Sequence, residues 1–155
     1  FSYFSFGSYY LLKGDFEMAL DYHKRLLNTN DSKNKWGLSF AHELIGETYE
    51  KLDKNDMALK HYNHSLNLAI EINNQIFIAG NYKNIGEIFY NTTNYEKALE
   101  NFHMSLTTAK TFNDEKLIDE IKGLIGTTYY DIGDYVKAAK FGHKGAQEKI
   151  NKKDN

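Results

Sequence analysis

The sequence predicts an all-α chain of four repeated helical hairpins, and three observations support this fold class. Glycines recur 39, 40 and 40 residues apart, as Gly7, Gly46, Gly86 and Gly126. Each is followed twelve residues later by an alanine, as Ala19, Ala58, Ala98 and Ala138. Apolar residues around them follow the spacing of helices that are buried on one face. A fixed period of this length is typical of stacked units that complete one another's core.

Each repeat is predicted to be a pair of antiparallel helices, because its apolar spacing is interrupted once by a short polar turn. Glycine in such a turn relaxes the backbone, and Asp or Asn can cap the helix that follows. The four turns read Lys13-Gly14-Asp15-Phe16, Asp53-Lys54-Asn55, Thr93-Asn94-Tyr95 and Ile132-Gly133-Asp134-Tyr135. We expect repeats over approximately 1–30, 36–72, 75–112 and 115–152, within a single domain 1–155.

The residues around each glycine are predicted to form the seam between the two helices of a repeat. An apolar residue precedes each glycine, and an aromatic residue follows it three positions later on the same helical face. The first set is Phe6, Ile45, Ile85 and Ile125, and the second is Tyr10, Tyr49, Phe89 and Tyr129. The glycine lets the two helices approach closely, so a large residue there should cost about 1–3 kcal/mol.

Composition and charge exclude several classes of function. The formal net charge is −2, and Arg25 is the one arginine among 19 basic residues, so no broad basic face is available for nucleic acid. No apolar run approaches the roughly 20 residues of a membrane-spanning helix. We predict a cytoplasmic chain without membrane insertion. Phe1 opens a strongly aromatic stretch in place of a methionine, and we interpret the chain as a piece of a longer protein.

The third repeat carries the fullest motif: Gly86 with Phe89, the turn Asn94-Tyr95, the pair Ala98-Leu99, and then Phe102. This pattern resembles the tetratricopeptide repeat family, and the resemblance extends over nearly the whole chain. The spacing of about 40 residues is similar to the long-repeat branch of that family. The resemblance implies a right-handed α-superhelix, or solenoid, of four antiparallel helix-turn-helix repeats. It specifies the fold more narrowly than the function, because such scaffolds carry many partners.

The resemblance also implies a concave groove that receives an extended or helical peptide. Its positions, carried over repeat by repeat, are Phe4, Ser8 and Leu11; Glu43, Glu47 and Glu50; Lys83, Asn84, Glu87 and Tyr90; and Thr127 and Tyr130. Chaperone-binding members hold a terminal carboxylate at such positions with Lys and Asn, whereas Glu43 and Glu47 would repel it. We therefore predict a ligand with Lys or Arg, held by charge and aromatic contacts, with Asn84 on its backbone.

Each of these groove residues has a simpler interpretation. The three glutamates would equally form a solvated helix face that pairs with Lys51 or Lys54. Tyr90 and Tyr130 would equally fill helix seams with only their hydroxyls exposed. Lys83 would equally neutralise Glu87 one helical turn later. These alternatives remain open from the sequence.

No catalytic, cofactor or metal site is predicted. His61 and His64 lie three residues apart on one helix, but zinc needs a third ligand that converges on the ion, and the sequence indicates none. Glu47 and Glu87 have no accompanying nucleophile, oxyanion donor or phosphate-binding loop. We expect a non-enzymatic chain.

The last helix is predicted to be slim, because small residues follow one side of it. These residues are Ala139, Gly142, Gly145 and Ala146. Such a face needs a close neighbour, and we expect either a helix from a further repeat or a second copy of the chain there. The alternative is a frayed capping unit.

Three functions fit these observations. The first is a scaffold or sensing module for protein–protein interaction that docks a basic peptide. The second is the regulatory peptide sensor of a larger bacterial signalling protein, in which the ligand shifts an existing equilibrium. The third is an architectural repeat that self-associates through its ends.

Overall fold

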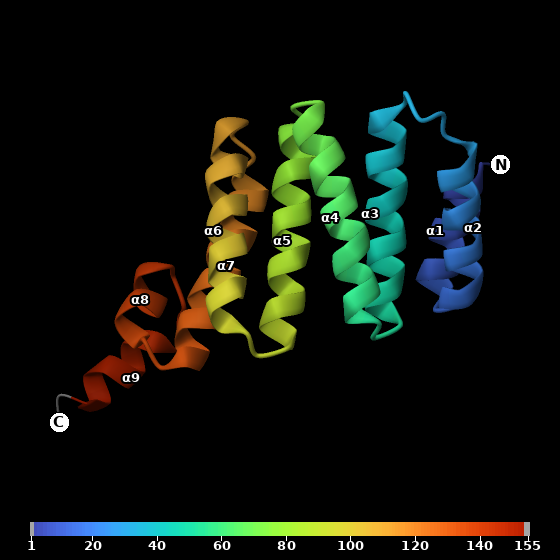
Figure 1. Cartoon of the computed structure of the whole chain (residues 1–155). Helices are drawn as coiled ribbons and strands as arrows, with labels where there is room; N and C mark the ends of the chain where they lie inside the picture. The colour runs from blue at the N-terminus through green and yellow to red at the C-terminus, as the bar shows by residue number, and fades with distance from the viewer. Residues whose placement is uncertain (1, 154–155) are drawn as a thin grey trace. The chain divides into compact units, whose positions relative to one another are not determined.

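The computed structural model describes residues 2–153, and that part of the chain is built from helices joined by short turns (Figure 1). The predicted all-α class is confirmed. The two ends of the predicted span 1–155, which are Phe1 at the start and Asp154 and Asn155 at the finish, lie outside the described residues. The helices are α1 (Tyr3–Lys13), α2 (Phe16–Thr29), α3 (Lys35–Lys51), α4 (Asn55–Glu71), α5 (Gln75–Asn91), α6 (Tyr95–Thr111), α7 (Glu115–Ile132), α8 (Tyr135–Lys140) and α9 (Ala146–Lys153).

The chain divides into two compact units, the first ending at Asn81 and the second beginning at Tyr82. The division falls within α5, so residues 75–81 belong to the first unit and residues 82–91 to the second. The single domain expected from the sequence stays a prediction.

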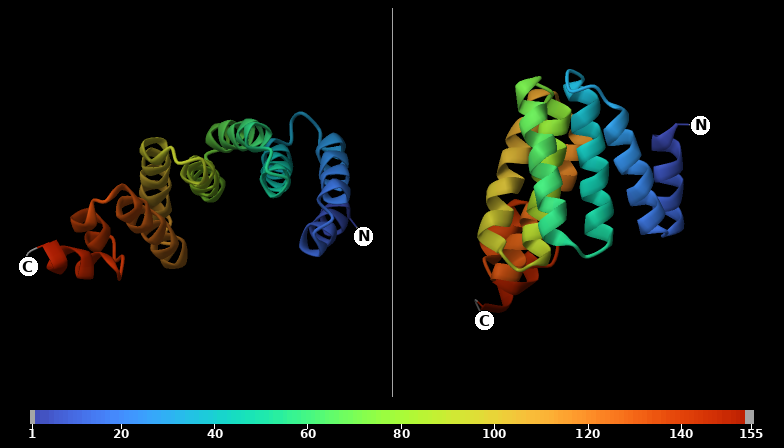
Figure 2. Two further views of the ribbon diagram at one scale, coloured as in Figure 1. Left: turned by 90° about the horizontal axis from the view of Figure 1, so that it is seen from below. Right: turned by 45° about the vertical axis from the view of Figure 1, so that its right-hand side comes forward.

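In the first unit, α1 packs against α2, α2 against α3, and α3 against α4. Both views of Figure 2 keep α3 and α4 side by side. The seam glycines act as predicted: a Cβ on Gly7 would clash with the ring of His23, and a Cβ on Gly46 would lie 2.8 Å from the ring of Tyr62. In both hairpins of this unit, a ring from the second helix therefore packs directly on the glycine of the first helix.

The second unit repeats this seam. A Cβ on Gly86 would lie 2.6 Å from the ring of Phe102, and Ala98 is fully buried beside it. In the same unit α6 packs against α7, α7 against α8, and α8 against α9. The seam isoleucines Ile85 and Ile125 are buried as predicted.

The turns within the hairpins share one backbone conformation. Gly14, Asp53, Thr93 and Gly133 occupy equivalent positions and all have positive φ, between 55° and 91°. The next residue is the N-cap, and Asp15, Asn94 and Asp134 each accept a hydrogen bond from the first turn of the following helix. The second turn departs from the prediction, because its N-cap is Lys54 and no side chain caps α4.

The final helix is not continuous, which corrects the predicted slim helix. Helix α8 ends at Lys140, Gly142 adopts φ +84°, and α9 begins at Ala146. Gly142 and Gly145 therefore lie in the connection between two helices, and Ala146 is fully buried.

This break has a packing reason. Phe141 places its ring 6.0 Å from that of Tyr129, with 26° between the planes, and its backbone oxygen would lie 3.3 Å from a Cβ on Gly126. Ending the helix here brings an aromatic ring to the seam, although Gly142 stands where the third repeat has Phe102. The four small residues consequently share no single helix face, and self-association through them stays a prediction.

Candidate binding surfaces

The three glutamates predicted for the groove lie on α3 in the first unit, and all are half-buried. They gather around the hydroxyl of Tyr62, which donates a hydrogen bond to Glu50 Oε2 at 2.9 Å. Burial, followed by the charges of Glu50, Glu47 and Glu43, raises the pKa of Tyr62. These carboxylates thus create a negative field, and their burial differs from that of an ordinary solvated helix face.

Lys83 lies on the part of α5 that belongs to the second unit, and it is held by two carboxylates. Its Nζ lies 2.8 Å from Glu120 Oε1 on α7 and 3.6 Å from Glu87 Oε2. Burial lowers the pKa of Lys83, but the two carboxylates outweigh burial and raise it. The predicted pair with Glu87 is present, whereas the shorter contact with Glu120 was not expected. Asn84, next along α5, is half-buried.

Tyr90 and Tyr130 pack within the second unit. The Tyr90 hydroxyl donates to Asp131 Oδ2 at 2.5 Å, and its ring lies 5.7 Å from that of Tyr95. The Tyr130 ring stacks on His143 at 4.2 Å, with Tyr135 at 5.2 Å. These contacts engage both rings and the Tyr90 hydroxyl within the unit, and a role of either tyrosine in ligand binding stays a prediction.

The twelve predicted groove residues divide equally between the units. The first unit holds Phe4, Ser8, Leu11, Glu43, Glu47 and Glu50, and the second holds Lys83, Asn84, Glu87, Tyr90, Thr127 and Tyr130. Thr127 is half-exposed on α7. Within the first unit the carboxylates come together, and within the second Lys83 and Glu87 do.

A histidine cluster adds a residue that sequence reasoning missed. His61 and His64 on α4 are joined by His42 from α3, whose Nδ1 lies 2.9 Å from Nδ1 of His61. The His42 ring lies 5.1 Å from that of His64. Within residues 2–153, however, no three side chains of metal-binding type are arranged to hold an ion.

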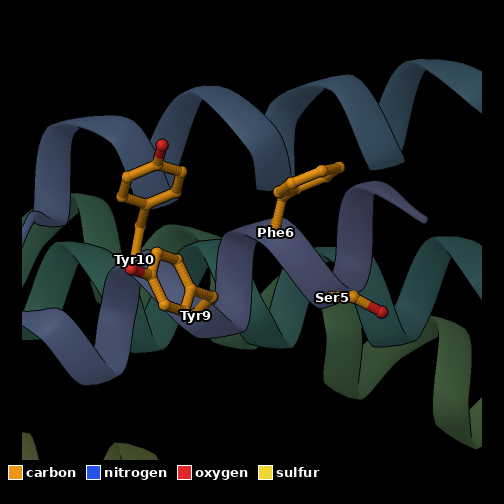
Figure 3. Close-up of a pocket in the computed structure, with 4 residues that line it drawn as sticks. All are labelled: Ser5, Phe6, Tyr9 and Tyr10. Atoms are coloured by element: carbon orange, nitrogen blue, oxygen red, sulfur yellow. The ribbon is translucent and has the colours of Figure 1, made fainter. Parts of the chain in front are cut away.

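Helix α1 presents an exposed aromatic surface. Ser5, Phe6, Tyr9 and Tyr10 line a hollow of about 290 Å³. Figure 3 shows Phe6 and Tyr10 projecting from one side of the helix, and both rings stack on Tyr22 of α2, at 5.2 and 5.5 Å. Tyr9 is 57% exposed, whereas Thr48 at the equivalent position of α3 is buried. The preceding helix α2 covers that face of α3.

The paired helices with glycine seams are the arrangement expected of a helical repeat. The family model described as tetratricopeptide repeat matches residues 41–74, which include most of α3 and all of α4. The predicted resemblance to the tetratricopeptide repeat family is confirmed. No curated protein sequence matches the chain.

Several solved structures are similar to this chain in fold. The apo form of RapI has a TM-score of 0.84 at 17% identity, covering 97% of this chain and 56% of that one. Aspartyl phosphate phosphatase F from Bacillus subtilis has a TM-score of 0.84 at 19% identity, covering 96% and 40%. The Rap conjugation gene regulator of plasmid pLS20, in complex with the Phr* peptide, has a TM-score of 0.74 at 16% identity, covering 88% and 38%.

At these identities the likeness shows the fold. This chain spans 38–56% of the length of those three structures. In the described part of the chain, no helix combines the length and apolar character needed to cross a bilayer.

Proposed function

We propose that this chain is a non-enzymatic docking module that binds a peptide or protein segment containing Lys or Arg. The observation that carries the proposal is the gathering of Glu43, Glu47 and Glu50 on one helix, where their charges act together on the Tyr62 hydroxyl. Half-buried carboxylates attract a cation more strongly than fully solvated ones, because the effective dielectric constant is lower. A basic side chain is the complementary partner.

The charged residues around Lys83 in the second unit have a structural role in this proposal. Lys83 is already held by Glu120 and Glu87, so it offers little to an acidic ligand. The proposal therefore assigns recognition of the basic ligand to α3 and assigns Lys83 to the packing of α5 against α7.

The test is the binding of fluorescently labelled peptides of equal length that carry lysine, glutamine or glutamate at the same positions. We expect the lysine peptides to bind most tightly and to weaken with added salt, because salt screens exposed charges. The Glu47→Gln variant should weaken the lysine peptides alone. Glu17→Gln, on the exposed side of α2 in the same unit, is the matched control and should leave binding unchanged.

Two results would overturn the proposal. One is equal or tighter binding of the glutamate peptides. The other is an unchanged affinity for the lysine peptides in Glu47→Gln, with circular dichroism showing that the variant remains helical.

A second candidate function is the sensing of a peptide within a larger regulatory protein. It is favoured by one observation, the similarity in fold to the pLS20 regulator solved with the Phr* peptide. In this role the bound peptide would shift an equilibrium between conformations. Hydrogen exchange measured with and without a bound lysine peptide separates the two candidates, since a sensor should change protection far from the contact and a docking module should not.

A further inference from the structure

Four aromatic side chains from three helices meet at one place in the first unit. They are Phe4 on α1, Trp36 and Phe40 on α3, and Phe77 on α5, and together we name them the aromatic platform. The centroid distances are 5.2 Å for Phe4–Phe40, 5.6 Å for Trp36–Phe40, 5.7 Å for Trp36–Phe77 and 6.2 Å for Phe40–Phe77. Residues far apart in the sequence thus form one continuous patch.

The aromatic platform is open to solvent. Trp36 is 53% exposed and Phe4 is 40% exposed, while Phe40 and Phe77 are half-buried. Phe40 and Phe77 are nearly parallel, with 9° between their planes. Exposed aromatic patches of this kind mark binding surfaces, because burying the rings releases a large apolar area from water.

A carboxylate lies one helical turn away from the two parallel rings. Glu43 follows Phe40 by three residues on α3, a rise of about 4.5 Å. Its Oε1 would lie 3.5 Å from a Cβ on Gly80, which follows Phe77 by three residues on α5. Glu43 is therefore directed toward α5 just beyond the ring pair, so apolar and acidic surfaces adjoin.

The basic residue next to Trp36 in the sequence is paired away from the aromatic platform. Lys35 lies with its Nζ 2.5 Å from Glu71 Oε2 on α4. Glu43, in contrast, places a carboxylate beside the aromatic platform.

We propose that the aromatic platform is an anchor site for an apolar or aromatic side chain of the same ligand, one or two residues from its Lys or Arg. This inference rests on the proposed docking of a basic segment and adds its second recognition element. Alternate side chains of an extended peptide lie about 6.4–6.8 Å apart, about 2 Å more than the rise of about 4.5 Å between Phe40 and Glu43. The long, flexible lysine side chain can span this difference by bending toward the carboxylate. The ligand class is an extended segment that pairs an apolar residue with a basic one.

The chain's one tryptophan lies in the aromatic platform, so its fluorescence reports occupancy directly. The probes are peptides with the cores Lys-Ser-Phe-Ser-Lys, Lys-Ser-Ala-Ser-Lys and Gln-Ser-Phe-Ser-Gln in identical neutral flanks. The symmetric cores work in either chain direction. We expect the first peptide to shift Trp36 emission and to bind about tenfold more tightly than the second, the gain typical of burying one aromatic side chain.

Two variants locate the effect. Phe40→Ala should bring the affinities of the Phe and Ala peptides together. Ile76→Ala alters a 64% exposed residue beside Phe77 and should leave the tenfold difference intact. Should Phe40→Ala lose helicity, Phe77→Leu provides a milder removal of one ring.

The outcomes separate this inference from the function on which it rests. Equal binding of both lysine peptides, with an unchanged Trp36 spectrum and weakening by Glu47→Gln, overturns the anchor site and retains basic-segment docking. Tight binding of the glutamine peptide overturns the charge requirement and retains the anchor site. A Trp36 shift that follows protein concentration without peptide, together with a doubled mass in sedimentation, overturns the anchor site in favour of contact with a second copy.

Discussion

The Nδ1 atoms of His42 and His61 lie 2.9 Å apart, on facing helices of the second hairpin. One nitrogen must donate and the other must accept, so at least one of the two rings is neutral. His64 contributes a third ring to the cluster, and Tyr49 of α3 lies 5.5 Å from the His61 ring. Two basic side chains, Lys60 of α4 and Lys24 of α2, also act on His61.

This arrangement predicts that stability falls on acidification. Burial first, and then the charges of His42, His64, Lys60 and Lys24, lower the pKa of His61 to about 4. The unfolded chain keeps a histidine pKa near 6.5 and binds the proton more readily. The stabilisation is therefore complete above about pH 6.5 and is lost as the pH falls toward 4.

Thermal unfolding midpoints measured across that range check this prediction. The His61→Gln variant should show a smaller decline, because it cannot take up the proton. It should keep part of the decline, since burial also lowers the pKa of His23 and His103. Parallel curves for the two proteins would contradict a role for the cluster.

The sequence predicted the hairpins well because glycine and alanine at fixed spacing record a physical contact. Gly46 and Gly86 each lie against a ring, and a Cβ at either position would be 2.6–2.8 Å from that ring. The sequence revealed only part of the histidine cluster. His61 and His64 lie three residues apart on one helix, whereas His42 contacts them from the other helix of the hairpin. The one sequence signal for His42 is its position in the repeat, which places it on a helix that faces α4.

The break after α8 was missed for an energetic reason. Two mid-helix glycines cost about 0.8–1.0 kcal/mol each relative to alanine. A cost of this size does not show, from the repeat pattern alone, whether the helix continues or ends. The structure ends the helix and gains the ring of Phe141 against Tyr129. The aromatic platform was missed because Trp36, Phe40 and Phe77 do not occupy equivalent repeat positions.

Replacing a glycine that packs against a ring should destabilise the fold, whereas replacing a glycine with free space around it should not. The Gly86→Ala change places a Cβ 2.6 Å from the ring of Phe102, and we expect it to lower the free energy of unfolding by about 1–3 kcal/mol. Gly123 lies inside α7, and a Cβ there would meet nothing within 4 Å. Gly123→Ala should raise the free energy of unfolding by up to about 1 kcal/mol through helix propensity. Denaturant unfolding of both variants checks the opposite signs.

Replacing Thr93 with glycine should stabilise the protein, because the backbone conformation of Thr93 favours glycine. It is β-branched and holds φ +59°, where Gly14 and Gly133 stand in the first and fourth repeats. A left-handed conformation costs an L-residue about 1–2 kcal/mol, partly offset by the entropy that glycine loses on folding. We expect Thr93→Gly to raise the free energy of unfolding by about 0.5–1 kcal/mol in chemical denaturation.

The neighbouring threonine is the control for that change. Thr92 has no positive φ, and its hydroxyl donates to the Ile88 carbonyl at 2.9 Å. Thr92→Gly should therefore destabilise the protein. Equal effects of the two substitutions would show that backbone strain at Thr93 is not the cause.

Helix α4 lacks a side-chain cap at its N-terminus. Asp15, Asn94 and Asp134 cap their helices through a side-chain oxygen, but the equivalent Lys54 has none to offer and places a positive charge at the positive end of the helix dipole. Lys54→Asp supplies both an acceptor and a negative charge. We expect it to raise the free energy of unfolding by about 0.5–2 kcal/mol.

The reverse substitution calibrates this effect within the same chain. Asn94 Oδ1 accepts from the Lys97 amide at 3.4 Å, and Asn94→Ala should lower the free energy of unfolding by about 0.5–2 kcal/mol. Because the first-unit and second-unit turns share their backbone conformation, the gain at Lys54 and the loss at Asn94 should be similar in size. A loss at Asn94 without a gain at Lys54 would mean that the backbone amides of α4 are already satisfied by water at this exposed turn, and capping would then not limit the stability of the second hairpin.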